Sequence, residues 1–131
     1  MTIPGRNDVP KEPPRVLIFD NDRKVIMELK ECIKAEGYHV VCVEQTNELF
    51  EYVIDDQIDV LVLAVETWDS KGYELLPILK KLKSNLPIIV TSADDSMEVA
   101  TKVREQGVFF YAIKPLDIEE VKIALRSAIG V

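Results

Sequence analysis

The sequence lacks several features that define common classes of protein. Its longest apolar runs, such as Val60–Val65, are far too short to span a bilayer, and the N-terminal stretch MTIPGRNDVPKEPPR has no apolar signal region. Lys and Arg number 16 against 23 Asp and Glu, and the net charge of −7 disfavours non-specific binding to nucleic acid or anionic membrane. We therefore expect a cytoplasmic protein with no membrane contact and no direct nucleic-acid contact. DNA binding by another domain of a longer protein stays open.

Cysteine, histidine and glycine-rich phosphate loops, which serve disulfide, thiolate or imidazole metal, and nucleotide chemistry, are also scarce. The two cysteines, Cys32 and Cys42, lie in apolar segments without CxxC spacing, which favours reduced core thiols over a disulfide or a metal site. The single histidine, His39, stands at the start of an expected strand and is interpreted as a surface residue. The stretch FDNDRK after the first expected strand is acidic and has no glycine, which disfavours a nucleotide phosphate there.

The length and composition predict one domain with a substantial core, because 131 residues are 47% hydrophobic. Residues 1–14 are rich in proline and show no periodicity, so we expect a flexible N-terminal segment. The remaining residues, 15–131, are expected to form the domain.

Five short apolar runs alternate with five amphipathic segments. The expected strands cover residues 15–20, 39–43, 60–65, 87–93 and 108–114. This regular alternation implies a parallel sheet with helices on both faces and right-handed crossovers. The strands are almost uniformly apolar, as is usual when both faces of a sheet are covered.

Capping residues predict where the helices begin. Helix starts are assigned to Asp22, to Thr46, to Asp95 with Glu98, and to Asp117 with Glu120. Gly37 and Gly107 are expected to end the first and fourth helices. Residues 73–84 also read as a helix, provided that Pro77 lies in its first turn.

Polar side chains gather where the expected strands end. These are Asp20, Asn21 and Asp22 after the first strand, Ala64 and Glu66 at the third, Thr91 and Ser92 at the fourth, and Lys114 at the fifth. Ligands of open parallel sheets bind at the carboxyl ends of the strands, so this edge is the candidate site. Acidic groups with a hydroxyl and a lysine suit a Mg²⁺ ion and a phosphate group.

Three stretches, VLIFDND, PIIVTSA and YAIKP, carry a family resemblance in their order and spacing. Over residues 15–130 the chain resembles the CheY-like receiver domains of response regulators in bacterial two-component phosphorelay signalling. The resemblance implies an α/β, flavodoxin-like (βα)₅ three-layer sandwich with strand order 2-1-3-4-5. It also implies phosphorylation by a histidine kinase of an aspartate that ends the third strand, with Mg²⁺ held by the acidic cluster.

The resemblance assigns roles to single residues. Asp20 matches the metal-binding acid, Asn21 replaces its usual acidic neighbour, Glu66 takes a position whose backbone carbonyl helps to bind metal, Ser92 and Lys114 match the phosphate-binding hydroxyl and lysine, and Tyr111 matches the switch aromatic. Ala64 falls on the phosphoacceptor position, and an alanine methyl cannot form an acyl phosphate. The further departures at Asn21 and in VETWDSKG favour natural degeneration over an engineered substitution.

These assignments predict a pseudo-receiver that is not an enzyme and works through protein contacts. Its partners would be a histidine kinase, an output domain or another signalling protein, with a homodimer through the fourth helix, fifth strand and fifth helix as one form. Ser92 and Lys114 would be a vestigial phosphate site. Mg²⁺ binding through Asp20, Asn21 and Glu66 is expected to be weak or absent.

Each of these residues also has a simpler structural interpretation. In place of a metal site, Asp22 would cap a helix and Asp20 would be a solvated acid. In place of binding phosphate, Lys114 would form an ion pair with Asp20. Tyr111 would be an ordinary strand aromatic. Trp68 is interpreted either as a partner-binding anchor or as a lid on the site.

Two other functions compete with the pseudo-receiver. A working phosphoacceptor would use Asp69 or Glu66, although neither lies on the rigid strand end that positions an in-line attack. A small-ligand-binding α/β module would use the same cleft, but the acidic, glycine-poor strand ends give it little support.

Overall fold

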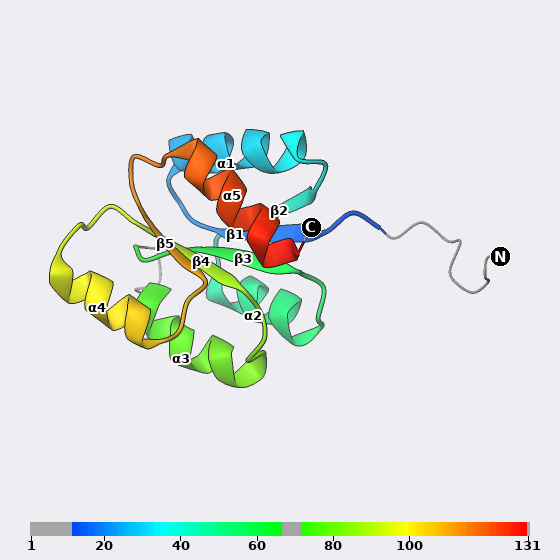
Figure 1. Ribbon diagram of the computed structural model, residues 1–131. Coiled ribbons are helices and arrows are strands. Elements are labelled where there is room, and N and C mark those ends of the chain that lie inside the picture. Colours follow the sequence, from blue (N-terminus) through cyan, green and yellow to red (C-terminus); the bar gives the residue numbers. More distant parts are fainter. Residues whose placement is uncertain (1–11, 67–71, 131) are drawn as a thin grey trace.

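Five β-strands alternate with five α-helices in the computed structural model, which describes residues 12–66 and 72–130 (Figure 1). In chain order they are β1 (Arg15–Phe19), α1 (Arg23–Ala35), β2 (His39–Val43), α2 (Thr46–Ile54), β3 (Val60–Ala64), α3 (Gly72–Leu82), β4 (Ile88–Ser92), α4 (Met97–Glu105), β5 (Phe110–Ile113) and α5 (Ile118–Ile129). Within these described residues, no helix is long and apolar enough to cross a bilayer.

The sheet has the order β2-β1-β3-β4-β5 and every paired strand is parallel, which confirms the predicted topology. Helices α1 and α5 cover one face, and α2, α3 and α4 cover the other (Figure 1). The result is the three-layer flavodoxin-like sandwich expected from the sequence.

Side-chain alternation along the strands divides the core into two layers. Leu61 and Leu63 of β3 pack into the layer beside α2, α3 and α4. Val60 and Val62 of the same strand pack against α1 and α5. Both β3 and β4 are buried along their whole length, which explains their uniformly apolar sequences.

The same alternation places the residues at the strand ends. Asp20 continues the face of Ile18, and Ala64 continues the face of Val62, so both belong to the α1/α5 side. Thr91 pairs with Ala64 in the register of β3 and β4. Asp20, Ala64 and Thr91 therefore follow one another across three neighbouring strands.

Two predicted helix caps and the predicted helix start at Thr46 are confirmed, and one predicted cap is wrong. The Asp22 carboxylate accepts hydrogen bonds from the backbone N–H groups of Lys24 and Val25, and Asp117 makes the matching contacts for α5. Helix α4, however, is capped by Ser96, whose hydroxyl accepts from the Val99 N–H at 3.3 Å. Asp95 does not cap it because α4 begins only at Met97.

The position of Pro77 also differs from the prediction. Helix α3 begins at Gly72, so Pro77 is its sixth residue and lies beyond the first turn. Proline has no N–H to donate to the carbonyl four residues earlier, and the helix continues past it to Leu82.

The cysteines and the histidine lie as predicted. Cys32 is buried, Cys42 is half-buried, and both are free thiols. Burial raises the pKa of both thiols above the ordinary value, which favours the protonated form. His39 is exposed at the start of β2.

The cap of α4 gives a direct test of the helix boundary. Ser96→Ala should lower the free energy of unfolding by about 1 kcal/mol, because the Val99 N–H loses its acceptor. Asp95→Ala is the matched control and should change it by less than about 0.5 kcal/mol. Urea unfolding of both variants measures the difference. A larger loss in the Asp95 variant would show that the helix begins earlier.

Candidate functional site

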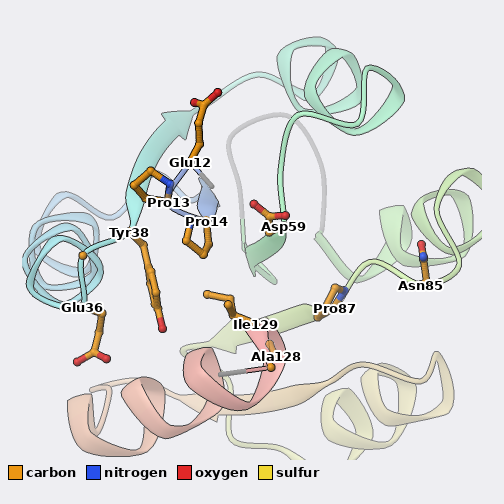
Figure 2. Close-up of a pocket in the computed structure, with 12 residues that line it drawn as sticks. Glu12, Pro13, Pro14, Glu36, Tyr38, Asp59, Asn85, Pro87, Ala128 and Ile129 are labelled. Atoms are coloured by element: carbon orange, nitrogen blue, oxygen red, sulfur yellow. The ribbon is translucent and has the colours of Figure 1, made fainter. Parts of the chain in front are cut away.

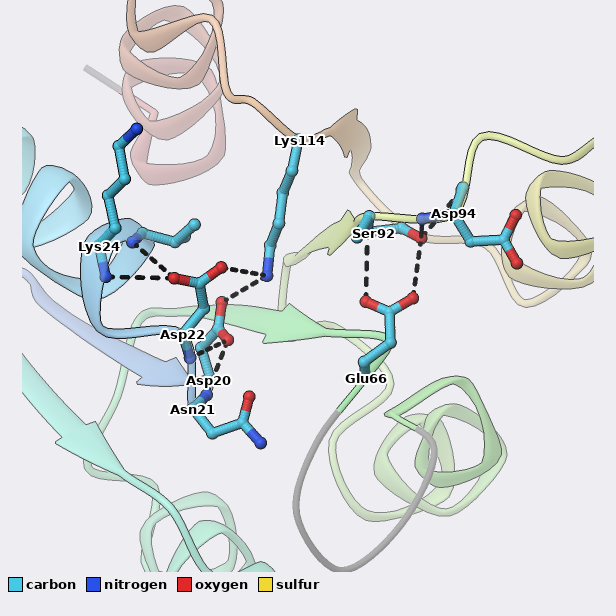
Figure 3. A network of polar contacts seen from close by, with 10 residues as sticks. Asp20, Asn21, Asp22, Lys24, Glu66, Ser92, Asp94 and Lys114 are labelled. Carbon is cyan, nitrogen blue, oxygen red and sulfur yellow. Dashed lines mark hydrogen bonds and ion pairs between the residues drawn. The ribbon is translucent and has the colours of Figure 1, made fainter.

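The carboxyl edge of the sheet brings the predicted site residues into two separate groups of polar side chains (Figure 3). The Asp20 group consists of Asp20, Asp22 and Lys114. The Glu66 group consists of Glu66, Ser92, Asp94 and the backbone N–H of Ala93. Parallel strands end at the same edge, which is why residues distant in the sequence meet there.

Asp20 is a buried acid, with only 2% of its surface exposed. Its Oδ1 accepts hydrogen bonds from the backbone N–H groups of Asn21 at 2.7 Å and Asp22 at 3.0 Å. Oδ2 has no such bond among the described residues, and it faces the Lys114 ammonium at 3.2 Å. The interpretation of Asp20 as a solvated acid is therefore wrong, because the residue extends β1 into the covered edge of the sheet.

Lys114 forms the ion pair that the sequence suggested. Its side chain is 11% exposed, and its Nζ lies 3.2 Å from Asp20 and 4.0 Å from Asp22 Oδ2. Its backbone N–H donates to the Ser92 carbonyl at 2.7 Å, which fixes the residue after β5 beside the end of β4. The Lys114–Pro115 peptide bond is cis.

In the Glu66 group, a carboxylate lies across the end of β4. Ser92 is fully buried, and its hydroxyl lies 3.4 Å from Glu66 Oε2. The Ala93 N–H donates to Glu66 Oε1 at 3.3 Å, so both carboxylate oxygens face the same short stretch (Figure 3). The Ser92 hydroxyl also accepts from the Asp94 N–H at 2.9 Å and lies 3.0 Å from the Asp94 carbonyl, a second acceptor for its one proton.

Tyr111 connects this group to α4. Its hydroxyl donates to the Asp94 carbonyl at 3.3 Å, and the Arg104 guanidinium lies 5.6 Å from the centre of its ring. A backbone hydrogen bond from Ser96, followed by one from the Ser96 hydroxyl, holds the pKa of Asp94 below its usual value. Tyr111 therefore packs half-buried against the core while its hydroxyl contacts the loop after β4.

The sequence reasoning named Thr91 at this edge without giving it a role, and it missed Gly72. The Thr91 hydroxyl is buried and has no hydrogen-bond partner among the described residues. Gly72 donates its N–H to the Val65 carbonyl, and a side chain at Gly72 would overlap the Ala64 carbonyl oxygen. Alternation along β4 was the available signal for Thr91, since it places Thr91 on the face of Ala64 and Ser92 on the opposite face.

The sequence model of the response regulator receiver domain family matches residues 16–126 of this chain. The chain belongs to this family. Among curated proteins, it is 32% identical to the DNA-binding transcriptional regulator NtrC of Azospirillum brasilense over 88% of this chain and 24% of that protein. It is 30% identical to the response regulator MprA of Mycolicibacterium vanbaalenii over 88% of this chain and 50% of that protein. The chain thus spans about a quarter of the first relative and half of the second.

Solved structures agree with the family assignment. The receiver domain of a Francisella response regulator matches with a TM-score of 0.81 and 28% identity, covering 89% of this chain and 97% of that one. A putative response regulator from Chloroflexus aurantiacus has a TM-score of 0.83 at 23% identity, covering 91% and 99% of the two chains. The chain is therefore a receiver domain of two-component signalling in both sequence and fold.

The Mg²⁺ ion implied by the receiver family does not fit the side chains as they lie. Asp20 Oδ2 faces Lys114, the Glu66 carboxylate turns toward Ser92, and no dashed contact is drawn to the Asn21 side chain (Figure 3). Across residues 12–66 and 72–130, there is no cluster of three or more His, Cys, Asp or Glu residues that could hold a metal. A weak or absent metal site stays a prediction.

A separate cleft of about 840 Å³ lies at the opposite, amino-terminal edge of the sheet (Figure 2). Tyr38, Asp59 and Pro87, which precede three strands, line it together with the last turn of α5. None of the predicted site residues borders this cleft, so it gives no support to ligand binding at the receiver site. Trp68 and Asp69, which were also considered for the site, lie outside the described residues.

The buried ion pair predicts a large effect of removing one partner. Lys114→Met should lower the free energy of unfolding by about 3 kcal/mol, because the buried Asp20 carboxylate would lose its counter-charge. Adding Asp20→Asn should recover part of that loss. The control is Lys83→Met, which removes a more exposed pair with Asp56 and should cost less than about 1 kcal/mol. Equal losses in the two single variants, measured by urea unfolding, would contradict the assigned role of Lys114.

The isolated Thr91 hydroxyl predicts a stabilising substitution. Thr91→Val has nearly the same shape and removes a buried polar group without a partner, so it should raise the free energy of unfolding by about 1 kcal/mol. Thr101→Val, at an exposed position in α4, is the control and should be nearly neutral. If Thr91→Val is destabilising instead, the hydroxyl has a partner that these contacts do not include.

Proposed function

We propose that this receiver domain signals through protein contacts without being phosphorylated, and that it is not an enzyme. The observation that carries the proposal is Ala64 at the end of β3, where the family resemblance places the acceptor aspartate. A methyl group has no lone pair to attack a phosphoryl donor. Ser92 and Lys114 would then be remnants of a phosphate site that serve structural roles.

The neighbouring carboxylate is a poor substitute for the missing nucleophile. Glu66 lies two residues beyond Ala64, outside the regular strand, and both its oxygens face Ser92 and Ala93. In-line attack requires a nucleophile held in position by a rigid element. Because both oxygens of Glu66 already face other groups, the structure supports the proposal that the domain is not phosphorylated, rather than the alternative that Glu66 is the phosphoacceptor.

Mg²⁺ is proposed to bind weakly or not at all. Asn21 supplies no charge, and the ion pair of Asp20 with Lys114 opposes the approach of a cation. Hard divalent cations need several oxygen ligands at once, which these side chains offer only after rearrangement.

The surface formed by α4, β5 and α5 is the proposed contact site. It carries four exposed large hydrophobic side chains, Met97, Phe109, Ile113 and Ile123. A groove of about 460 Å³ between β5 and α5 is lined by Phe109, Phe110 and Ile123 among others. Strand β5 is also at the edge of the sheet. Exposed apolar side chains beside a groove, such as Phe109 and Ile123 here, are typical of protein–protein contact sites.

The partner class follows from the family. Receiver domains of NtrC-like regulators interact with kinases and output domains. The match to NtrC covers 88% of this chain and 24% of NtrC. A kinase, an output domain or another signalling protein is therefore the proposed partner. A homodimer joined through the α4–β5–α5 face is a further proposed contact, and it can be tested with the purified protein alone.

Treatment with a small-molecule phosphodonor tests the central proposal. With acetyl phosphate and Mg²⁺, the intact mass of the protein should not change, because Ala64 offers no acceptor oxygen. A receiver domain with an aspartate at the acceptor position, treated in parallel, controls for the activity of the donor. A stoichiometric gain of one phosphate, mapped to Glu66 or Asp69, would replace the proposal with the phosphoacceptor alternative.

The proposed contact surface makes a prediction about self-association. Ile123 is 61% exposed beside the groove, so Ile123→Glu should reduce dimerisation at least tenfold by placing a charge in the contact. Met27→Glu changes a similarly exposed residue, 66%, on α1 and should have little effect. Sedimentation equilibrium measures both. Equal effects of the two substitutions would place the contact elsewhere.

A further inference from the structure

The Glu66 group has the arrangement of an anion-binding site that is already filled. The Ala93 N–H donates to Glu66 Oε1, and the Ser92 hydroxyl lies 3.4 Å from Glu66 Oε2 and shares its one proton between this oxygen and the Asp94 carbonyl at 3.0 Å. Backbone N–H groups and hydroxyls are usual donors to oxoanions, and bonds to charged acceptors are stronger than bonds to neutral ones. The bound anion here belongs to the chain itself.

We propose that Glu66 is an internal ligand whose carboxylate occupies an oxoanion site formed by the Ser92 hydroxyl and the Ala93 amide. The ligand class of the site is a small oxoanion, such as a carboxylate or inorganic phosphate. Because Glu66 is tethered two residues beyond β3, it fills the site at a high effective concentration and excludes such ions from solution.

The two polar groups explain why this site holds Glu66 and not another acid. Asp20 and Asp22 are both paired with Lys114, whose Nζ lies 3.2 Å and 4.0 Å from their carboxylates. The Asp94 carboxylate is also engaged, since it accepts from the Ser96 N–H at 2.8 Å. Within the described part of this edge, Glu66 is the acid left to accept from Ala93.

Occupancy of the site is connected to α4 through hydrogen bonds. The Ser92 hydroxyl accepts a hydrogen bond from the Asp94 N–H and also faces the Asp94 carbonyl. That carbonyl accepts a hydrogen bond from the Tyr111 hydroxyl. The anion therefore helps to fix the loop between β4 and α4 and, through it, the position of Tyr111. Loss of the Glu66 carboxylate is expected to shift both, and an external anion is expected to restore them.

The test is a titration with inorganic phosphate, followed by the NMR signals of the Ala93 amide and the Tyr111 ring. Wild-type protein should respond only weakly. Glu66→Ala should move the Ala93 and Tyr111 signals, bind phosphate roughly tenfold more tightly, and return the signals toward their wild-type positions as phosphate is added. Glu66→Gln keeps one acceptor oxygen, so its gain should be smaller.

Two further variants separate a specific site from a general effect of charge. Glu31→Ala removes an equally charged, exposed residue on α1 and should leave phosphate binding as in the wild type. Adding Ser92→Ala to Glu66→Ala should cancel most of the gained affinity, since one donor is removed. The proposal is overturned if Glu66→Ala and Glu31→Ala bind phosphate equally, or if the Ser92 substitution changes nothing.

This experiment does not depend on whether the chain is phosphorylated. The titration measures reversible binding, whereas the phosphodonor experiment measures a covalent gain in mass. If phosphate fails to bind the Glu66 variant, the proposal of an internal ligand is overturned, and the proposal of a phosphorylation-independent function is unaffected.

Discussion

The burial of the Asp20 carboxylate is the constraint on which the arrangement of the site depends. An ionised acid that is almost fully removed from water needs both hydrogen bonds and a counter-charge. Two backbone N–H groups satisfy one oxygen, and Lys114, which follows the edge strand β5, faces the second. The ion pair therefore joins the ends of β1 and β5. The residues at the ends of β3 and β4, which lie between these two strands, must leave room for it.

Ala64 lies in the middle of that span and divides the edge into two parts. The lysine is committed to the acids at the end of β1, and the hydroxyl of Ser92 is committed to the loop after β4 and to Glu66. With alanine, the two parts stay separate, and Thr91 on the same face is left with a buried hydroxyl.

The sequence predicted the features that depend on local chemistry. Apolar runs located all five strands, and Asp22 and Asp117 marked two helix starts because an acid at an N-cap is a short-range signal. The cap of α4 was harder, since Asp94, Asp95 and Ser96 all suit the role and the choice depends on where the loop from β4 ends. The direction of the Glu66 side chain could not be predicted, because its partners lie at the end of β4 and in the residue after it, 26 and 27 residues away.

A receiver with an internal anion differs from a phosphorylated one in how its conformations are balanced. A ligand shifts an equilibrium only by its difference in affinity for the two states. A phosphoryl group is added and removed, so the balance changes with time, whereas a carboxylate in the chain is always present. If Glu66 holds the loop after β4, regulation has to come from something that competes for Ser92 and Ala93 or for the α4–β5–α5 face. The contact from Tyr111 to Asp94 joins these two places, so a partner bound at the face and the carboxylate at the strand end would act on the same equilibrium.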